Sequence, residues 1–270
     1  MQYVDFYHLW GISWEKFETS LACKGGPLTE FLKLKEEGLV RHLSFSFHSK
    51  PEEMKRLIDT GYFETVLCQY NLLDRANEEA IAYAASKGIG VAIMGPVGGG
   101  RLAWPSDKLG VLLGKKKSVS TPELALRFVL SNRNVSLALS GMSSLEQLEQ
   151  NVATASNETY LSPGEERKVM QAMNENRRLA ELYCTGCGYC APCPNKVDIP
   201  RVFQLVNYER VYGLKEPARS EYKDLVSGTH WSKNCGANAC KECGLCEPKC
   251  PQKIKIMDQL KQAHKMLTGS

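Results

Sequence analysis

Eight cysteines in the last third of the sequence stand at spacings that suit metal binding. The first run reads Cys184-Thr-Gly-Cys187-Gly-Tyr-Cys190-Ala-Pro-Cys193-Pro194, and the second reads Cys240-Lys-Glu-Cys243-Gly-Leu-Cys246-Glu-Pro-Lys-Cys250-Pro251. Four thiolates at such spacing, followed directly by proline, are the ligand pattern of cubane iron–sulfur clusters. The sequence therefore predicts metal ligands at Cys184, Cys187, Cys190, Cys193, Cys240, Cys243, Cys246 and Cys250.

Structural zinc is the alternative, because paired Cys-x-x-Cys motifs also bind zinc. Each run here has four cysteines and ends in proline, which favours two 4Fe–4S clusters. In two-cluster proteins the last cysteine of each run ligates the other cluster. This rule predicts one cluster on Cys184, Cys187, Cys190 and Cys250 and the other on Cys240, Cys243, Cys246 and Cys193. We expect Cys23, Cys68 and Cys235 to bind no metal.

Composition bounds the class of protein. The 270 residues are 43% hydrophobic, which is enough for one larger domain and one small one. The net charge of +4 falls within residues 181–270, where thirteen Lys/Arg face nine Asp/Glu. This mild surplus is not a nucleic-acid footprint. It either offsets the negative clusters or forms an ordinary basic surface.

The cellular location can be predicted from membrane-spanning and signal segments and from the use of cysteine. No apolar run is long enough to span a bilayer, and the first residues do not resemble a signal peptide. Eleven cysteines in such a chain favour metal ligation over disulfides. We therefore expect a cytoplasmic protein with no nucleic-acid or membrane partner.

Strand and helix patterns alternate in the first part of the chain. The apolar runs predict five strands, each followed by a helix: the strands at 3–10, 42–47, 64–73, 89–95 and 135–141, the helices at 29–38, 51–61, 77–88, 121–132 and about 144–153. Such alternation indicates parallel strands joined by crossover helices, an α/β fold. A long helix is expected over 162–183. Two further helices are expected at 199–213 and 253–267, whereas 216–238 is polar with little pattern.

The cysteine region resembles the α-helical ferredoxin domain of fumarate-reductase-type iron–sulfur subunits. Forty-six residues, including a helical segment, separate its two runs. The first run departs from the pattern by one residue, since two residues rather than three separate Cys190 from the final Cys193. We predict a partial barrel over 1–160, a connecting helix over 161–183 and a helical two-cluster domain over 184–270.

The segments YVDFYHLW, RHLSFSFH, CQYNLLDR, GPVGGGRL, TPELALRFVLS and ALSGMSSLEQLEQN occur in the order seen in aldo/keto reductases. The resemblance covers residues 2–155 and extends to the iron–sulfur branch of that family. It implies strands 4–8 of a (β/α)₈ TIM barrel that binds NAD(P)H at the carboxyl ends of its strands.

The resemblance also implies three sets of cofactor contacts. Ser46 and Gln69 match the contacts to the nicotinamide carboxamide, whose donor and acceptor suit a hydroxyl and an amide. The pyrophosphate loop corresponds to Gly95, Pro96, Val97 and Gly98, where glycines allow close approach of backbone N–H groups. The segment that closes over the adenosine end contributes Gly141, Gln147 and Asn151.

Three departures from the family matter. The chain starts at the family's fourth strand, so the catalytic tyrosine, lysine and aspartate are not assigned and the catalytic residues are unknown. Trp10 stands where the family has its catalytic histidine, and His8 is expected to be a packed core residue. Gln147 replaces an arginine that binds the 2′-phosphate, and Met94 replaces a stacking aromatic, so no preference between NAD and NADP is predicted.

Two functions follow. The first is an aldo/keto reductase-like oxidoreductase, in which NAD(P)H-linked redox of a carbonyl or related small molecule is coupled to electron transfer through the clusters, with a redox protein as a further partner. The second is a non-enzymatic iron–sulfur electron-transfer or docking module. Five strands cannot close an eight-stranded barrel. The open edge predicts either a fragment or completion by another chain.

Overall fold

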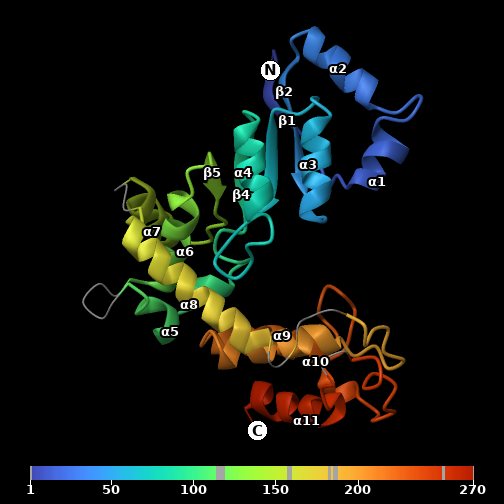
Figure 1. Ribbon diagram of the computed structural model, residues 1–270, viewed down its shortest axis with the longest axis vertical. Helices are drawn as coiled ribbons and strands as arrows, with labels where there is room; N and C mark the ends of the chain where they lie inside the picture. Colours follow the sequence, from blue (N-terminus) through green and yellow to red (C-terminus); the bar gives the residue numbers. More distant parts are fainter. Residues whose placement is uncertain are drawn as a thin grey trace. The chain divides into compact units, whose positions relative to one another are not determined.

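The computed structural model describes residues 2–113, 119–156, 160–181, 184, 188–250 and 253–269, with only the backbone described over 177–181 (Figure 1). The chain divides into two compact units. One comprises Met1–Gly99 and Ala125–Leu161, and the other comprises Gly100–Leu124 and Ser162–Ser270. The predicted functional domains 1–160, 161–183 and 184–270 stay a prediction, since compact units and functional domains need not share boundaries.

The first unit is built on a five-stranded parallel sheet in the order β1-β2-β3-β4-β5. Its strands are β1 (Val4–Leu9), β2 (Val40–Phe47), β3 (Thr65–Gln69), β4 (Gly90–Met94) and β5 (Leu137–Leu139). In the described chain β1 and β5 are the edge strands. All neighbours are parallel, so the carboxyl ends of the strands lie at one edge of the sheet, where polar side chains from successive strands meet.

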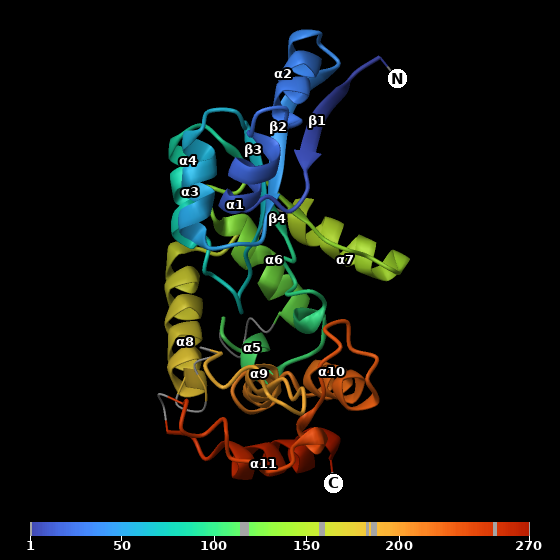
Figure 2. The ribbon, with the colours of Figure 1, turned by 90° about the vertical axis from the view of Figure 1, so that its right-hand side faces the viewer.

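Five helices of this unit follow the strands as the alternation predicts. They are α2 (Leu28–Glu36), α3 (Pro51–Asp59), α4 (Glu78–Ser86), most of α6 (Thr121–Ser131) and α7 (Leu145–Ser156). Two short helices between β1 and α2 were not predicted: α1 (Trp14–Lys16) and the π-helix η1 (Phe17–Leu21). Helices α3 and α4 lie side by side against the sheet (Figures 1 and 2). Pro51 at the first position of α3 has the backbone angle that a helix start requires.

The central strand β2 is buried on both faces, with two kinds of side chain. Leu43, Phe45 and Phe47 alternate with Ser44 and Ser46, and all five are at most 4% exposed. The aromatic set packs on Phe63, whose ring centroid lies 4.8 Å from that of Phe45. The serines therefore occupy the opposite face, which carries polar groups toward the carboxyl edge.

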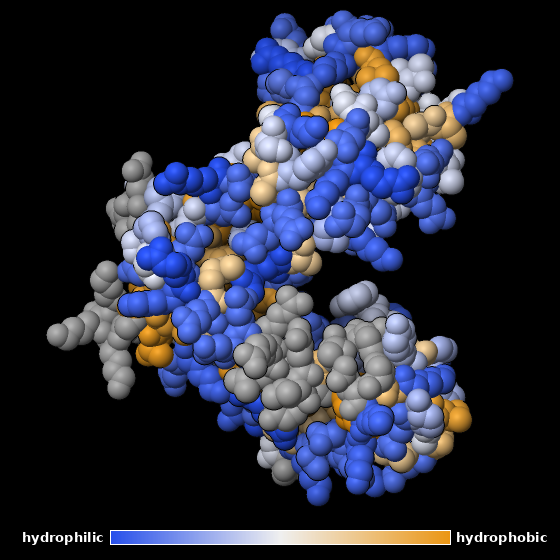
Figure 3. Space-filling view, in the orientation of Figure 1, coloured by the Kyte–Doolittle hydropathy of each residue, from blue (hydrophilic) through white to orange (hydrophobic). Residues whose placement is uncertain are grey.

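The edge strand β1 is exposed, which corrects one expectation. His8 is exposed rather than packed in a core, and Trp10 is 80% exposed. Phe6 and Tyr7 are also exposed, at 51% and 40%. Hydrophobic surface is visible at the end of the unit that carries β1 and α2 (Figure 3). The reason is topological, because β1 has a neighbour on one side only within the described chain.

The second unit is helical. Its elements are η2 (Arg101–Ala103), α5 (Asp107–Gly110), α8 (Pro163–Glu181), α9 (Ile199–Arg210), α10 (Lys215–Ser227), η4 (Ala237–Ala239) and α11 (Ile256–Thr268). Helices α9, α10 and α11 pack on one another around buried side chains that include Val202, Tyr222 and Leu260 (Figure 2).

Helix α10 was not predicted. Residues 216–238 show little pattern because the buried side of α10 has only Ala218, Tyr222 and Leu225. These stand four and three residues apart, which is helical spacing, but polar residues fill the rest of the helix. No described helix is long and apolar enough to cross a membrane.

Candidate functional site

The two cysteine segments fold alike. Gly188 and Gly244 each precede the third cysteine of a run by two residues, and both have positive φ, at 79° and 74°. Lys196 and Lys253 each stand three residues after the final cysteine, and both are left-handed, at 56° and 52°. A non-glycine residue in that conformation carries a steric cost. Both cysteine segments thus contain a left-handed glycine before the third cysteine and a left-handed lysine after the last cysteine.

Each of these turns leads into a helix. The Lys196 N–H donates to the Cys193 carbonyl at 2.9 Å, and the Lys253 N–H donates to the Cys250 carbonyl at 3.0 Å. Helix α9 begins three residues after Lys196, and α11 begins three residues after Lys253. In α9 the N-cap Asp198 accepts from the Arg201 N–H and from the Asn234 side chain. The cysteines are therefore positioned by turns anchored to the helical core.

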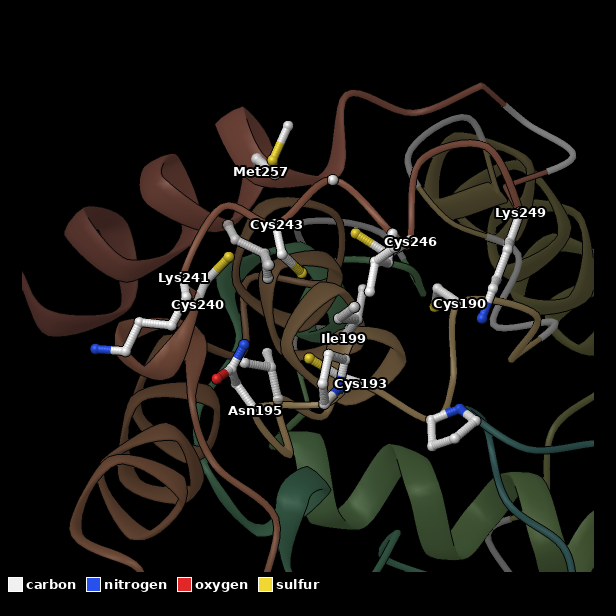
Figure 4. Close-up of a pocket in the computed structure, with 16 residues that line it drawn as sticks. Cys190, Cys193, Asn195, Ile199, Cys240, Lys241, Cys243, Cys246, Lys249 and Met257 are labelled. Carbon is white, nitrogen blue, oxygen red and sulfur yellow. The ribbon is translucent and has the colours of Figure 1, made fainter.

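Five of the predicted ligands line one cavity. Its wall includes Cys190, Cys193, Cys240, Cys243 and Cys246, and its floor is formed by apolar residues such as Val197, Ile199 and Leu260. The cavity encloses about 460 Å³ including its open mouth. In Figure 4 the sulfur atoms of Cys193, Cys240, Cys243 and Cys246 face the same space, whereas Cys190 lies to one side. Cys193 from the first run thus joins three cysteines of the second.

The remaining predicted ligands are not gathered in this way. Cys184 and Cys250 are partly exposed and do not line the cavity. Cys187 lies outside the described residues. The set Cys184, Cys187, Cys190 and Cys250 therefore stays a prediction. Cys235 also stands off the cavity wall, and its backbone pairs with Val197 and Asp198 instead.

The thiols of the cavity lie close enough to affect one another's ionisation. Burial is the main cause that raises the pKa of the Cys246 thiol above its ordinary value, and the nearby charges of Cys240, Glu247 and Cys193 raise it further. Thiolates that repel one another in this way are stabilised when they bind metal. The Glu242 N–H donates to Cys240 Sγ at 3.5 Å, the type of hydrogen bond that tunes cluster potentials.

A single ion fits the described residues less well. A tetrahedral zinc site needs sulfurs about 2.3 Å from one ion. Within the part of the chain that the structure describes, no three His, Cys, Asp or Glu side chains come together to hold one ion. The cysteine sulfurs line a wider space.

The predicted nicotinamide contacts lie at the carboxyl edge of the first unit's sheet. Ser46 is 4% exposed, and its Oγ accepts from the Gly11 N–H at 2.8 Å, which leaves its own hydroxyl hydrogen to donate. Gln69 ends β3 and is half-buried. No described residue hydrogen-bonds its side-chain amide.

The glycine loop after β4 has the conformation that only glycine adopts freely. Gly95, Gly98 and Gly99 have φ of 63°, 63° and 66°. The Gly98 N–H donates to the Gly95 carbonyl at 2.8 Å, so the turn itself uses this group. Pro96 is buried and Val97 is partly buried.

Asn71 shapes this loop and was missed by sequence reasoning. It is fully buried, and its Nδ2 donates to the Gly95 carbonyl at 2.9 Å. Its Oδ1 accepts from the N–H groups of Leu73 and Asp74, both at 2.9 Å. The predicted strand 64–73 ran past the true end of β3 at Gln69. The sequence Asn-Leu-Leu-Asp could have marked the turn, since asparagine commonly caps such a turn.

The predicted adenosine contacts have structural partners. Gln147 Oε1 accepts from the Ser143 N–H at 2.8 Å at the start of α7, an arrangement like a capping box. Asn151 Nδ2 donates to Ser140 Oγ at 3.2 Å. Gly141 has open space where a Cβ would stand. Gly141 lies on the β5–α7 connection, Gln147 and Asn151 lie in the first turns of α7, and the contact of all three with a cofactor stays a prediction.

Comparison with known proteins identifies two sequence families. The model described as "Aldo/keto reductase family" matches residues 28–169, and the model described as "4Fe-4S dicluster domain" matches residues 183–257. These matches confirm the family resemblance and the ferredoxin-type iron–sulfur domain expected from the two cysteine runs.

Individual relatives match the first part of the chain. An uncharacterized oxidoreductase of Schizosaccharomyces pombe is 33% identical over 153 residues, which cover 54% of this chain and 49% of the relative. L-galactose dehydrogenase of Arabidopsis thaliana is 27% identical over 173 residues, which cover 57% of this chain and 53% of that protein. The chain thus spans about half the length of the curated relatives it matches.

A solved structure agrees with the fold. The holo form of an aldo-keto reductase from Bacillus halodurans is 25% identical, with a TM-score of 0.53, and the match covers 63% of this chain and 59% of that one. The parallel five-stranded sheet with its helices therefore has the (β/α)-barrel-like fold of aldo-keto reductases.

Proposed function

Because the chain belongs to the aldo/keto reductase family and carries a 4Fe–4S dicluster domain, we propose that it is the iron–sulfur part of an oxidoreductase. It would couple NAD(P)H-linked redox of a carbonyl or related small molecule to electron transfer through two 4Fe–4S clusters. The observation that carries the proposal is the shared cavity of Cys193, Cys240, Cys243 and Cys246. A cluster bound there supplies a site that accepts or gives one electron at a time.

Two clusters are favoured by the repeated construction of the cysteine segments. One cluster is assigned to Cys240, Cys243, Cys246 and Cys193, and the other to Cys184, Cys187, Cys190 and Cys250. Gly188 and Gly244 at matching positions, and Lys196 and Lys253 at matching positions, support two similar sites.

Nicotinamide binding is proposed for the carboxyl edge of the sheet. Ser46 and Gln69 would hold the carboxamide, with Gly95, Pro96, Val97 and Gly98 around the pyrophosphate and Gly141, Gln147 and Asn151 at the adenosine end. The free side-chain amide of Gln69 and the left-handed glycines support this assignment. Hydride transfer moves two electrons, whereas each cluster carries one electron at a time. The two electrons of NAD(P)H would therefore pass through the clusters in two steps.

Three further strand–helix units are proposed to complete the barrel. The five strands of the described sheet are neighbours in the order of the sequence, with exposed apolar side chains on both edge strands. Phe6 on β1 and Leu139 on β5 are each 51% exposed. Such edges are normally covered. The missing units would also supply the tyrosine, lysine and aspartate of the family, so a catalytic set is not assigned to this chain.

The second candidate is an electron-transfer or docking module without catalysis. It is favoured by Trp10, which stands at the family's histidine position and is 80% exposed. In this case only the cysteine unit would act, and the barrel-like unit would serve as a scaffold.

Cofactor binding separates the two candidates. Titration of the chain with NADPH and NADH by calorimetry is expected to show binding, weakened about fivefold in Gln69→Ala through the loss of about one hydrogen bond. Gln171→Ala on the exposed surface of α8 is the control and should bind as the unaltered chain does. Absence of binding in a chain with a redox-active cluster would favour the docking module.

A further inference from the structure

The mouth of the cysteine cavity combines apolar and cationic side chains. Leu245, which is 58% exposed, lines the cavity together with the exposed Pro192 and Pro194. Lys241 and Lys249 line it as well, and Figure 4 places them on opposite sides of the cysteine group. These five residues form what we call the cavity rim. No carboxylate of the described chain lines the cavity.

The surrounding segments carry more positive than negative charge. Lys196, Lys241, Lys249, Lys253 and Lys255 are all exposed, and none forms an ion pair with a described residue. The two glutamates of these segments already have partners. Glu242 pairs with Lys261 Nζ at 2.8 Å, and Glu247 Oε1 accepts from the Met257 N–H at 3.1 Å. Glu247 and Asp198 keep their negative charge because their partners are N–H groups, but the five lysines outnumber them and leave a net positive charge around the cavity.

The site also lies close to solvent at this mouth. Cys243 is exposed, whereas Cys193, Cys240 and Cys246 are partly exposed. The floor of the cavity is apolar and covered by α9 and α11, through Ile199 and Leu260. A partner protein that exchanges electrons with a group held here would approach most closely over Cys243 and the rim.

We propose that the cavity rim docks an acidic protein that carries one electron at a time. This inference rests on the proposed clusters. The lysines on opposite sides would steer and orient a negatively charged partner, and Leu245 with the two prolines would form a small dry centre. One electron would pass between the partner's redox group and the cluster, with no bond made and no proton moved. Complexes of this type are small and short-lived.

The test measures binding rather than turnover. The probe is an acidic plant-type 2Fe–2S ferredoxin in its oxidised form, titrated into the cluster-loaded full chain by microscale thermophoresis. Binding is expected at low ionic strength and should weaken at about 0.3 M salt, because exposed charges are then screened within a few ångströms.

Matched variants locate the surface. The charge reversal Lys241→Glu with Lys249→Glu is expected to weaken binding roughly tenfold or more at low salt. Lys215→Glu with Lys223→Glu makes the same change of charge on α10, away from the cavity wall, and should have a much smaller effect. Leu245→Ser should weaken binding without changing its dependence on salt, because it removes only apolar contact.

Iron and acid-labile sulfide are measured in every variant, which keeps this inference separate from the proposed function. A chain without iron and sulfide would refute the clusters themselves. If the clusters load normally, three results would overturn the docking surface: equal weakening by both charge reversals, no weakening by either, or tighter binding of basic cytochrome c than of the ferredoxin. If the rim lysines serve only to offset the charge of the clusters, their reversal would lower cluster loading and leave ferredoxin binding to loaded protein unchanged.

Discussion

At the scale of single residues, Cys193 decides how the two cysteine runs are connected. It belongs to the first run in sequence, yet it faces the cavity of Cys240, Cys243 and Cys246. The ligand rule of two-cluster proteins predicts this placement of Cys193. The shorter spacing before Cys193 did not prevent this placement, because the turn at Lys196 brings the chain directly into α9.

Removal of this one thiolate tests the connection. Cys193→Ser is expected to lower the iron and labile sulfide of the anaerobically reconstituted chain by about half, since one of two cubanes loses a ligand. Iron and sulfide assays provide the measurement. Cys235→Ser is the control and should retain both, because Cys235 stands off the cavity wall. Equal losses in the two variants would contradict the assigned ligand set.

Cys68 differs from the cysteines of the two runs in its surroundings. It is fully buried in β3, and burial raises its pKa to about 12. The pKa of this thiol is higher in the folded chain than the value of 9.0 that it has when unfolded. Below about pH 9 the thiol is protonated in both states and does not change the stability. As the pH rises from 9 toward 12 the thiol ionises only in the unfolded chain, so the free energy of unfolding falls.

The same burial predicts its reactivity. At pH 8 iodoacetamide should modify the exposed Cys23 and leave Cys68 unmodified until the chain is unfolded in urea. Mass spectrometry of the peptides gives the answer. Modification of Cys68 in the folded chain at the rate of Cys23 would show that β3 is not buried as described.

At the scale of elements, the segment after the glycine loop is the least expected feature. The described residues of 100–113 and 119–124 belong to the same compact unit as the cysteine segments, although they follow β4 and run into α6 of the other unit. Ser106 Oγ donates to the Tyr212 carbonyl at 2.7 Å and caps α5 by accepting from the Leu109 N–H at 3.2 Å. Lys108 Nζ donates to the Arg210 carbonyl at 2.7 Å. The segment thereby satisfies carbonyls at the end of α9.

Ser106 should hold this segment in place. Ser106→Ala removes both hydrogen bonds, and the free energy of local opening is expected to fall by about 1–2 kcal/mol. Hydrogen exchange measured by mass spectrometry would then be at least about fivefold faster in α5 and near Tyr212. Ser220→Ala on the exposed side of α10 should leave these amides unchanged. Unchanged protection in Ser106→Ala would mean that apolar packing of Leu102 and Leu109 suffices.

The elements themselves were predictable to different degrees. Strong periodicity and caps located the strands and helices of the first unit, as at Pro51 in α3. Helix α10 was missed because only Ala218, Tyr222 and Leu225 mark its buried side. The contact between the segment around Ser106 and the end of α9 was also missed. The hydrogen bond from Ser106 to Tyr212 joins positions that are far apart in the sequence and that no local pattern connects.

At the scale of the whole molecule, the chain joins a reductase-like fold to an iron–sulfur domain. The family matches establish both parts. The catalytic residues could not be predicted, because the positions that carry them in the family have no counterpart in this sequence. The iron–sulfur domain could be predicted from the two cysteine runs, since ligand type and spacing are local properties of the sequence.

Metal analysis decides whether the cysteines bind two cubane clusters. The chain is purified and reconstituted without oxygen, and iron, acid-labile sulfide and zinc are measured per chain, with electron paramagnetic resonance after reduction. The expected result is about eight iron and eight sulfide per chain, with a signal from reduced 4Fe–4S clusters. Zinc without iron or labile sulfide would show that the cysteines bind zinc and not iron–sulfur clusters.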